Sequence, residues 1–382
     1  MHKKPQDKFY VAPFRGKEGL ESIRNQWKIV NDNMNGKRFF HLYEWYISYI
    51  TALEKDDLSV YFFVVYWNDQ PRAIFPLRRT IKDIYGLKLM IFELPQETQM
   101  PFCDFILPKN DDTRDILRAF IGFLNGSHQF AWDVIRLPKV LEDCSILYSL
   151  NCTPYPLTIS EFVGYCNYLA CEPYDQIMKN VSKNFRSNLR KARNKLCKLE
   201  SVEYSYTRDA ALLQQYYKEF LDLEASGWKG IHGTRSAIKF RSRLPEFYSS
   251  LVENFSSIGG VEIQMLRVDG VAIASDFLLW IDNTCYKLKT AYDESYKKYA
   301  PGHMLRENLF KRCYETQEAK YINFISNADW HQQWKPLKHK VFTCSLFNKS
   351  PYGLSLFILK RCMKIVPPLY RSRLRRFFRF IS

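Results

Sequence analysis

Apolar and polar positions recur with two different periods along the chain, and this predicts helices interspersed with strands. Residues 59–66 form a continuous apolar and aromatic run typical of a buried strand, and the sequence Trp-Asn-Asp-Gln at 67–70 predicts a hairpin turn after it. Pro76 is expected at a strand edge or a bulge, because proline cannot donate to a ladder. For the first half the pattern predicts helices at 18–33, 42–53, 113–124 and 140–150, and strands at 59–66, 72–77, 87–94 and 132–137.

The second half repeats this order of elements. Asp269-Gly270, between two apolar runs, is a strong hairpin signal. Two such halves predict an α/β (α+β) fold that is built from a duplicated unit, with mixed sheets flanked by helices. The second half is predicted to contain strands at 203–206, 261–268, 271–281, 284–290, 321–325 and 340–347, and helices at 210–224, 236–255 and 303–316.

Positive charge is concentrated in two stretches. The chain carries a formal net charge of +16. Residues 330–382 contain 12 Lys and Arg and no acid, and residues 176–199 contain eight and no acid. Together these stretches exceed the net charge of the whole chain, so the rest is mildly acidic. This favours two local contacts with anions over a surface that coats nucleic acid.

Length and motifs narrow the class of protein. The 382 residues, 46% of them hydrophobic, predict two or three folded domains. The sequence has no apolar stretch of membrane-spanning length, and its polar N-terminus predicts no secretory signal. Ten dispersed cysteines then indicate reduced thiols in a cytoplasmic protein. The sequence lacks G-x-S-x-G, G-x-G-x-x-G, Walker A and C-x-x-C motifs, and its scattered histidines predict no metal site.

Three motifs in the second half resemble one known family. They are the run 223–234 (LEASGWKGIHGT), the run 291–302 (AYDESYKKYAPG) and the basic helix 182–196. Their order and spacing over 173–336 resemble the CelD-like acetyltransferases of the GNAT superfamily. Asn323 and Trp330-His331 depart from the family pattern, which leaves the acceptor open.

The resemblance implies tandem GNAT-like units with mainly antiparallel sheets. We expect a divergent N-terminal unit at 1–155, a GNAT acyltransferase domain at 156–350 and a basic amphipathic tail at 351–382. It further implies an N-acyltransferase that uses acetyl-CoA or another acyl-CoA in exopolysaccharide or cell-envelope biosynthesis, with an amino sugar on a carrier as acceptor. Two alternatives stay open: a Fem-type transferase whose donor is aminoacyl-tRNA, and a non-catalytic protein that kept the fold for envelope assembly or nucleic-acid binding.

The Pro301-Gly302 corner is the expected cofactor site. A helix N-terminus attracts anions, and glycine lets a diphosphate approach the backbone. An ordinary strand-to-helix turn is the alternative. A bulged strand before the corner can offer an N–H group to the thioester carbonyl. We therefore assign the following residues to the cofactor: Lys289, Thr290, Ala291, Lys298, Pro301, Gly302, His303 and Met304.

Acyl transfer also needs a base for the amine and an acid for the leaving thiolate. The candidates that we assign as catalytic are Glu224, Tyr292, Asp293 and His331. Glu224 is the preferred base, although an ion pair with Lys229 would explain it equally well. Asp276, an acid among apolar strand residues, is a further candidate for a buried, paired or functional carboxylate.

The acceptor is assigned to residues on three segments: Arg186, Arg190, Trp228, Lys229 and Tyr296. The helical stripe of arginines suits a polyphosphate carrier, or else is a solvated face. Trp228 forms either a wall of the site or a plug in the core. The tail interleaves apolar residues with Lys and Arg, which predicts contact with an anionic membrane on its cytoplasmic side, against nucleic acid or packing on the body.

Overall fold

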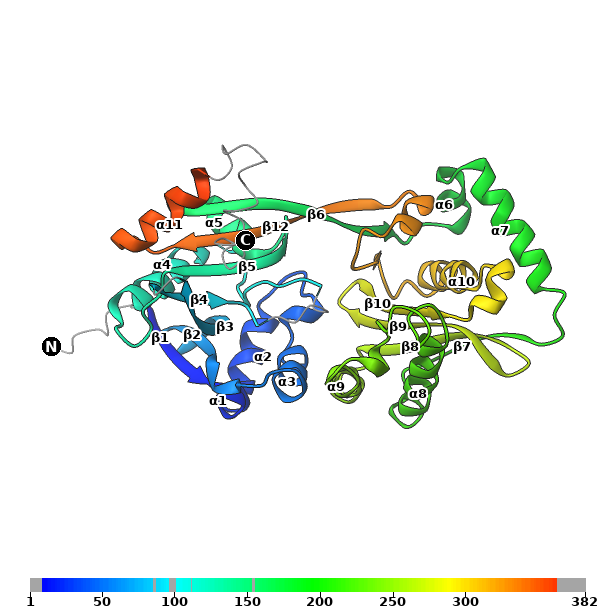
Figure 1. The fold of residues 1–382 in the computed structure, drawn as a ribbon, viewed down its shortest axis with the longest axis horizontal. Coiled ribbons are helices and arrows are strands. Elements are labelled where there is room, and N and C mark those ends of the chain that lie inside the picture. Colours follow the sequence, from blue (N-terminus) through cyan, green and yellow to red (C-terminus); the bar gives the residue numbers. More distant parts are fainter. Residues whose placement is uncertain (1–8, 85–86, 96–100, 111, 153–154, 363–382) are drawn as a thin grey trace.

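The computed structural model describes residues 9–84, 87–95, 101–110, 112–152 and 155–362. Within these ranges all strands join one sheet of 12 strands, in the order β1-β2-β3-β4-β5-β12-β6-β11-β10-β9-β8-β7 (Figure 1). Two strand pairs, β4–β5 and β10–β11, are parallel and the other neighbours are antiparallel. The predicted mixed, mainly antiparallel α/β architecture is therefore confirmed.

The first half contains β1 (Phe9–Arg15), α1 (Gly16–Ser22), α2 (Arg24–Asp32), η1 (Phe39–His41), α3 (Tyr43–Ala52), η2 (Asp57–Ser59), β2 (Val60–Trp67), β3 (Gln70–Ile84), β4 (Leu87–Glu93), α4 (Thr113–Gly126), β5 (Val134–Leu141) and α5 (Ser145–Cys152). The predicted helix 18–33 divides at Ile23, whose φ of −103° and ψ of 15° are not helical. The predicted helix at 140–150 starts only at Ser145, because Val140 still pairs with β12. Pro76 lies where β3 has β2 on one side but not yet β4, which pairs from Arg78 onward.

The second half contains β6 (Thr158–Ala170), α6 (Tyr174–Asn180), α7 (Lys183–Leu196), β7 (Val202–Thr207), α8 (Ala210–Ser226), η3 (Ile238–Phe240), α9 (Leu244–Ser256), β8 (Val261–Val268), β9 (Val271–Ile281), β10 (Thr284–Tyr292), η4 (Glu294–Tyr299), α10 (Pro301–Thr316), β11 (Tyr321–Asn323), η5 (Asp329–Trp334), β12 (Leu337–Phe347) and α11 (Pro351–Cys362). The hairpin β8–β9 turns at Asp269-Gly270 with φ of 50° and 77°, as predicted. The predicted helix 236–255 is interrupted, and α9 covers only its second part.

The sheet consists of two repeats that exchange their last strands. β1 to β5 and β7 to β11 follow the same order of pairing, each with a hairpin between the second and third strand and a parallel pair at the end. β6 follows the first repeat in sequence but pairs with β11 of the second, whereas β12 follows the second and pairs with β5. The two exchanged strands also pair with each other, and they form the long ribbon across the top of Figure 1. The domain boundaries at 155 and 350 stay predictions, since one sheet runs through both repeats.

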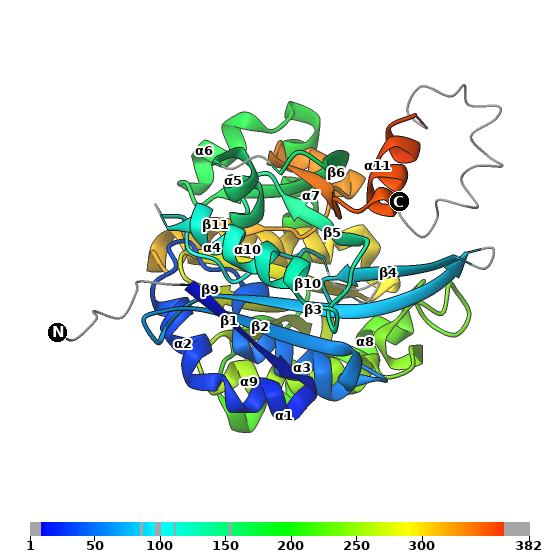
Figure 2. The same cartoon turned by 90° about the vertical axis from the view of Figure 1, so that its left-hand side faces the viewer.

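Helices cover both faces of the second repeat. Along β9, Phe277 and Leu279 pack into one cluster with α8 and α9, while Leu278, on the opposite face, packs with α7 and α10. The first cluster is continuous with the core of the first repeat, because α3 packs against α9. Figure 2 shows α3 and α9 side by side on the same side of the sheet.

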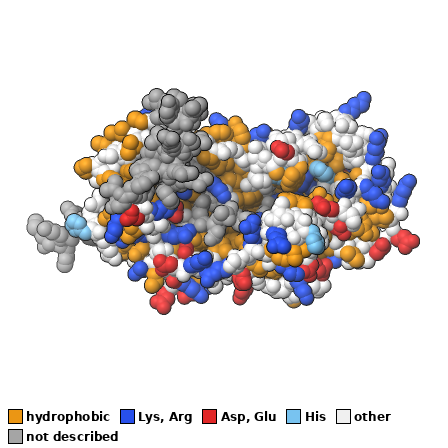
Figure 3. Space-filling view, viewed as in Figure 1, with side chains coloured by type: hydrophobic (Ala, Val, Ile, Leu, Met, Phe, Trp, Pro, Cys, Tyr) orange, Lys and Arg blue, Asp and Glu red, His pale blue; other side chains and the backbone are white. Residues whose placement is uncertain are grey.

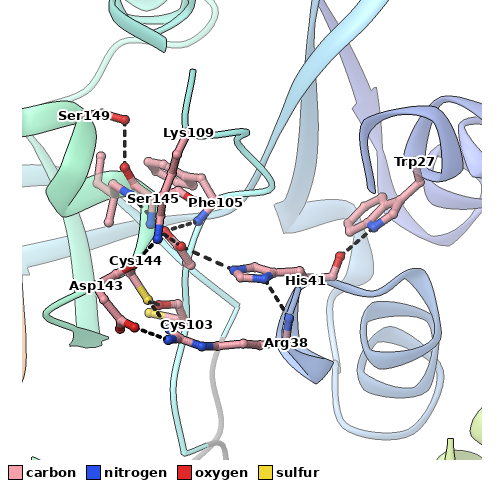
Figure 4. Close-up of polar contacts among 12 residues, drawn as sticks. Trp27, Arg38, His41, Cys103, Phe105, Lys109, Asp143, Cys144, Ser145 and Ser149 are labelled. Carbon is pink, nitrogen blue, oxygen red and sulfur yellow. Dashed lines mark hydrogen bonds and ion pairs between the residues drawn. The ribbon is translucent and has the colours of Figure 1, made fainter. Parts of the chain in front are cut away.

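In the first repeat, a buried segment occupies the space beyond the end of β4. Residues 102–107 are all buried, and Ile106 forms a bridge with Ile74 of β3, while the Cys103 N–H donates to Lys139 O just within β5. Asp104 anchors this segment, and its partners His41, Phe105 and Ser145 are labelled in Figure 4. Its carboxylate accepts hydrogen bonds from the backbone N–H groups of Phe105 at 2.9 Å, Ser145 at 2.6 Å and Ile146 at 3.1 Å. It also contacts His41 Nε2 at 3.3 Å.

These contacts fix the state of the buried pair. The Arg38 N–H donates to His41 Nδ1, so the imidazole carries its proton on Nε2 and gives it to the carboxylate. Burial lowers the pKa of His41, while the hydrogen bonds from His41 and from the backbone hold the pKa of Asp104 below its usual value despite its burial. This Asp–His pair therefore connects η1 to the start of α5. Both carboxylate oxygens and both ring nitrogens are engaged in hydrogen bonds, so the pair is structural.

Of the predicted tail at 351–382, the structure describes the first part, which forms α11. In α11, Leu356 and Phe357 pack against Phe347, and Lys360 Nζ lies 2.9 Å from Glu161 Oε2. The predicted tail residues 363–382 lie outside the described residues. Among the helices of the described ranges, none is both long and apolar enough to cross a bilayer.

Replacing Asp104 by Asn should destabilise the first repeat. The amide would point N–H donors at groups that are themselves donors, and a buried network that loses its acceptor costs about 3 kcal/mol. Urea unfolding of D104N should therefore show a clearly lower midpoint. Asp115→Asn, in an ion pair whose side chains are more than half exposed, is the matched control and should stay within about 0.5 kcal/mol of the parent. Equal stability of the two variants would contradict the anchoring role.

Candidate active site

The parallel strands β10 and β11 separate after three residue pairs. Their pairing runs from Thr284↔Tyr321 to Tyr286↔Asn323, whereas β10 continues to Tyr292. The register of β10 against β9 shifts between Lys287 and Lys289, so Leu288 forms a bulge. From Lys287 onward, the edge of β10 that faces away from β9 is therefore not paired with another strand of the described residues.

Asn323 ends β11 by a local hydrogen bond. Its Oδ1 accepts from the N–H of Ile325 at 2.8 Å, and Ile325 has a left-handed φ of 65°. Such an Asx turn competes with strand pairing. The asparagine that departs from the family pattern is therefore the residue that turns the chain away from β10.

A cavity of about 380 Å³ lies beside the open end of β10. It is bounded by the end of β10, the first turns of α10, η5 and the loop that follows α8. The lining residues are Leu223, Glu224, Gly227, Trp228, Lys229, Thr290, Ala291, Tyr292, Lys297, Ala300, Pro301, Gly302, His303, Arg306 and Trp330.

Two glycines of the loop after α8 permit a close approach of backbone to backbone. A Cβ atom on Gly230 would lie 2.0 Å from Ala225 O, and one on Gly233 would lie 1.8 Å from Trp228 O. The loop is closed by the hydrogen bond from Thr234 N–H to Trp228 O, at 2.8 Å. The glycines of the G-W-K-G-x-x-G-T run thus fold this loop back and leave Trp228, 52% exposed, at the rim of the cavity.

Glu224 is fully engaged in hydrogen bonds. Its Oε1 accepts from Lys229 Nζ at 2.9 Å, and its Oε2 accepts from the Ile238 N–H at 2.8 Å. Lys229 Nζ also donates to Thr290 O at 3.0 Å. Within antiparallel pairing, the N–H and C=O of one residue point to the same side. The Thr290 peptide edge therefore faces the cavity, and Glu224 holds Lys229 there through the ion pair that the sequence offered as the alternative. The role of Glu224 as the base stays a prediction.

His303 is a neutral donor at the start of α10. The Trp334 indole N–H, which can only donate, lies 3.2 Å from His303 Nδ1, so the ring proton is on Nε2. Burial, with the nearby charge of Arg306, lowers the pKa of His303 to about 3. His303, which lines the cavity, can therefore donate a hydrogen bond from Nε2, but it does not act as a base at neutral pH.

The predicted corner opens into the cavity but offers fewer backbone donors than expected. Nothing lies within 4 Å of a Cβ atom built on Gly302. The His303 and Met304 N–H groups both donate to Ala300 O, so the free N–H of the first turn, among the described residues, is that of Gly302. The positive end of the 16-residue α10 adds a partial charge of about +0.5 there.

The structure brings nine of the predicted residues together around the cavity: Glu224, Trp228, Lys229, Thr290, Ala291, Tyr292, Pro301, Gly302 and His303. Lys289 and Met304 are chain neighbours of these residues, and Tyr296 and Lys298 belong to η4, but none of the four lines the cavity. Asp293 accepts from the Ser295 N–H and caps η4. Asp276 is buried, with its Oδ1 2.7 Å from Lys287 Nζ.

His331 also lies outside the cavity lining. It is 1% exposed, and Asn167 Nδ2 lies 3.3 Å from its Nδ1. Its other polar contact is with the backbone of Ser326, and burial lowers its pKa to about 3. His331 therefore packs against β6, and its catalytic assignment stays a prediction.

Arg186 and Arg190 are exposed on α7, on the right in Figure 3, where basic side chains gather. The predicted apolar stripe of this helix is confirmed, since Phe185, Leu189, Ala192 and Leu196 are all buried. Neither arginine lines the cavity, so a contact with the acceptor would be made outside it.

Six residues of the cavity lining are not assigned to the site by the sequence: Leu223, Gly227, Lys297, Ala300, Arg306 and Trp330. Of these, Arg306 and Trp330 stack on each other. Arg306 is followed by Glu307 and Asn308, so its surroundings in sequence resemble a solvated helix face. In the sequence, Trp330 stands out only as a departure from the family pattern. No periodicity marks either residue, because their burial depends on η5 folding over α10.

Comparison with known proteins identifies the domain that holds the cavity. Residues 183–335 match the family model Acetyltransf_6, described as acetyltransferase (GNAT) domain, which is the CelD-like family. No curated protein matches the sequence. The chain carries a GNAT domain and is therefore an N-acyltransferase enzyme.

Similar solved structures extend over both repeats. The chain superposes on FemX with a TM-score of 0.56 and 11% identity, over 87% of this chain and 98% of that one. A conserved protein of unknown function from Bacteroides thetaiotaomicron VPI-5482 gives 0.54 and 15%, over 86% and 97%. At these identities the likeness concerns the fold alone, and it extends over both repeats.

Replacing Gly233 by Ala should open the loop after α8, because the Cβ atom would collide with Trp228 O. We expect amide hydrogen exchange in a peptide covering 227–235 to accelerate at least 10-fold, since the Thr234-to-Trp228 hydrogen bond would be lost. Gly122→Ala, where a Cβ atom meets nothing within 4 Å, is the control and should leave this exchange unchanged. Unaltered exchange in G233A would show that the loop does not need the close approach.

Proposed function

We propose that the chain is an acyl-CoA-dependent N-acyltransferase, with acetyl-CoA as the preferred donor and an amino sugar or related amine as acceptor, in exopolysaccharide or cell-envelope biosynthesis. The observation that carries this proposal is the open Gly302 corner beside the free edge of β10. A donor molecule lying between them would place its diphosphate at the positive end of α10.

The residues present suit such a donor. The Gly302 N–H is free, His303 presents a Nε2–H, and Lys297 lines the same cavity. Each of these three groups can bind an anion, and the missing side chain of Gly302 leaves room for a phosphate. An acyl-CoA, when bound, supplies an acyl group as a reactive thioester.

The chain's own groups can then assist transfer. The open edge at Thr290 offers a backbone donor to a carbonyl oxygen, and one such hydrogen bond contributes about 3 kcal/mol to a transition state. Tyr292 lines the cavity. When a neutral amine attacks the thioester carbonyl, the C–N bond forms and the C–S bond breaks. The Tyr292 hydroxyl can protonate the departing thiolate, and the proton that the amine nitrogen loses passes through water to the resulting tyrosinate. Lys229, held by Glu224, fixes this strand edge in position.

The aminoacyl-tRNA donor remains the second candidate, and the exposed basic face of α7 favours it. Lys183, Arg186, Arg190, Lys191 and Lys195 are exposed there and have no ion pair among the described residues. A polyanion bound to this face would make affinity fall steeply with salt. Incubation of the enzyme with labelled acetyl-CoA or with charged tRNA distinguishes the two donors by which label is consumed.

We further propose that the C-terminal part contacts the cytoplasmic face of an anionic membrane. In α11 the side opposite the packed residues exposes Leu354, Ile358 and Leu359, at 43–51%. Apolar residues at such spacing, next to basic ones, are typical of a helix that lies on a bilayer.

Gly302→Trp should abolish binding of coenzyme A. The indole would enter the space at the corner, whereas Gly302→Ala adds only a methyl group to open space and should bind within about threefold of the parent. Isothermal titration with coenzyme A measures both variants, and mass spectrometry of copurified ligands gives an independent check. Absence of binding to the parent at millimolar ligand would favour the non-catalytic alternative, and full binding by G302W would move the cofactor elsewhere.

Removal of residues after Cys362 should weaken co-sedimentation with vesicles that contain anionic lipid. The cut is placed there because Leu356 and Phe357 belong to the core, so removal of α11 would damage the fold. Each basic residue near such a surface contributes about 1 kcal/mol, so the loss should exceed 10-fold in partition coefficient. Ile358→Asn in the full chain tests the helix itself. Unchanged sedimentation of both variants would refute the membrane contact.

A further inference from the structure

Arg306 is a buried guanidinium without a carboxylate partner. It is 2% exposed, and no acid among the described residues lies within ion-pair distance. Its hydrogen bond goes to His303 Nδ1, at 3.3 Å, and its Nε has no partner. A buried arginine is normally paired, because removal of its charge from water is costly.

The surroundings of Arg306 contain more positive than negative charge. The charge of Asp276 acts on Arg306, but Asp276 Oδ1 is already taken by Lys287 Nζ and its Oδ2 accepts from Gln264 Nε2. One buried carboxylate therefore faces two buried cations. Burial lowers the pKa of Arg306 to about 10, so the guanidinium remains charged at neutral pH.

The geometry directs Arg306 toward the cavity. Trp330 stacks on one face of the guanidinium, with 4.1 Å from Cζ to the ring centroid, and Phe324 and Trp334 lie near it at 5.6 and 5.9 Å. Arg306 itself lines the cavity, together with Trp330. The aromatic rings fix the plane of the fork, which is the arrangement that recognises a planar carboxylate.

Arg306 is separate from the expected diphosphate position. It lies more than one helical turn beyond Pro301 and is buried, whereas Lys297 and the Gly302 corner are accessible. A diphosphate has several charges that favour water, but a single carboxylate matches the single uncompensated cation.

We propose that Arg306 binds a carboxylate of one of the two reactants, so that this enzyme acts on a carboxylate-bearing acceptor or transfers an acyl group that ends in a carboxylate. This inference rests on the proposed transferase function and specifies its substrate class. Trp330 is the positioning residue that holds the guanidinium.

Two matched pairs of probes separate the sources of the carboxylate. Acetyl-CoA is compared with succinyl-CoA, and glucosamine with muramic acid, which is the same amino sugar bearing a lactyl carboxylate. Isothermal titration of the full chain should show one carboxylate-bearing member binding at least 10-fold more tightly than its partner. That preference should fall below twofold in Arg306→Gln and be partly retained in Arg306→Lys.

The outcomes distinguish this inference from the proposed function. If the parent and Arg306→Gln bind acetyl-CoA equally and neither pair shows a preference, the carboxylate site is refuted while the transferase stands. If Arg306→Gln loses binding of both thioesters alike, Arg306 serves the diphosphate and the inference fails. If the parent binds neither thioester, the acyl-CoA function fails, and the sugar pair still decides the role of Arg306.

A stability measurement separates a ligand-binding cation from a structural one. Arg306→Met keeps the packing volume and removes an unpaired buried charge, so the ligand-free variant should melt at the same temperature as the parent or higher. In contrast, Arg193→Met removes a partner of the buried Glu307 and should lower the melting temperature. A drop in R306M as large as that in R193M would indicate that Arg306 holds the fold, and would overturn the proposal.

Discussion

The early separation of β10 from β11 is the constraint on which the site depends. A sheet satisfies backbone donors and acceptors by pairing, and an edge left open inside a protein needs other partners. Here the pairing stops at Asn323, and Lys229 takes one of the exposed carbonyl groups of β10. The remaining edge borders a cavity. The loop after α8, the start of α10 and η5 all lie around this opening.

Because β6 and β12 are exchanged, strands from both repeats hold the position of this opening. β6 pairs with β11 and so holds the short strand in place, although it follows the first repeat in sequence. The same strand pairs along its length with β12, which is fixed to β5. The central strands thus connect the first repeat, through β11, to the strand that borders the cavity in the second. This explains why similar structures superpose over most of the chain and not over one half.

Local patterns predicted the elements that are specified by their own residues. The β8–β9 hairpin follows from Asp269-Gly270 between apolar runs, and the Pro301-Gly302 corner follows from the conformations that these two residues favour. β1 and β6 were not predicted. The exposed Phe162 and Val163 in β6 break the alternation that marks a half-buried strand, and the pairing of that strand depends on residues almost 180 positions away. The burial of Arg306 was equally invisible, because it results from the tertiary placement of Trp330.

The two repeats solve the same electrostatic problem in opposite ways. In the first, three backbone N–H groups together with His41 satisfy the buried Asp104 carboxylate within the protein. The segment that carries Asp104 fills the space beyond β4. In the second, the buried Arg306 guanidinium has one hydrogen bond and an aromatic face, but no acid of the described residues lies within ion-pair distance of it. A buried group that is satisfied stabilises a fold, whereas one that is left incomplete beside a cavity selects the ligand that completes it.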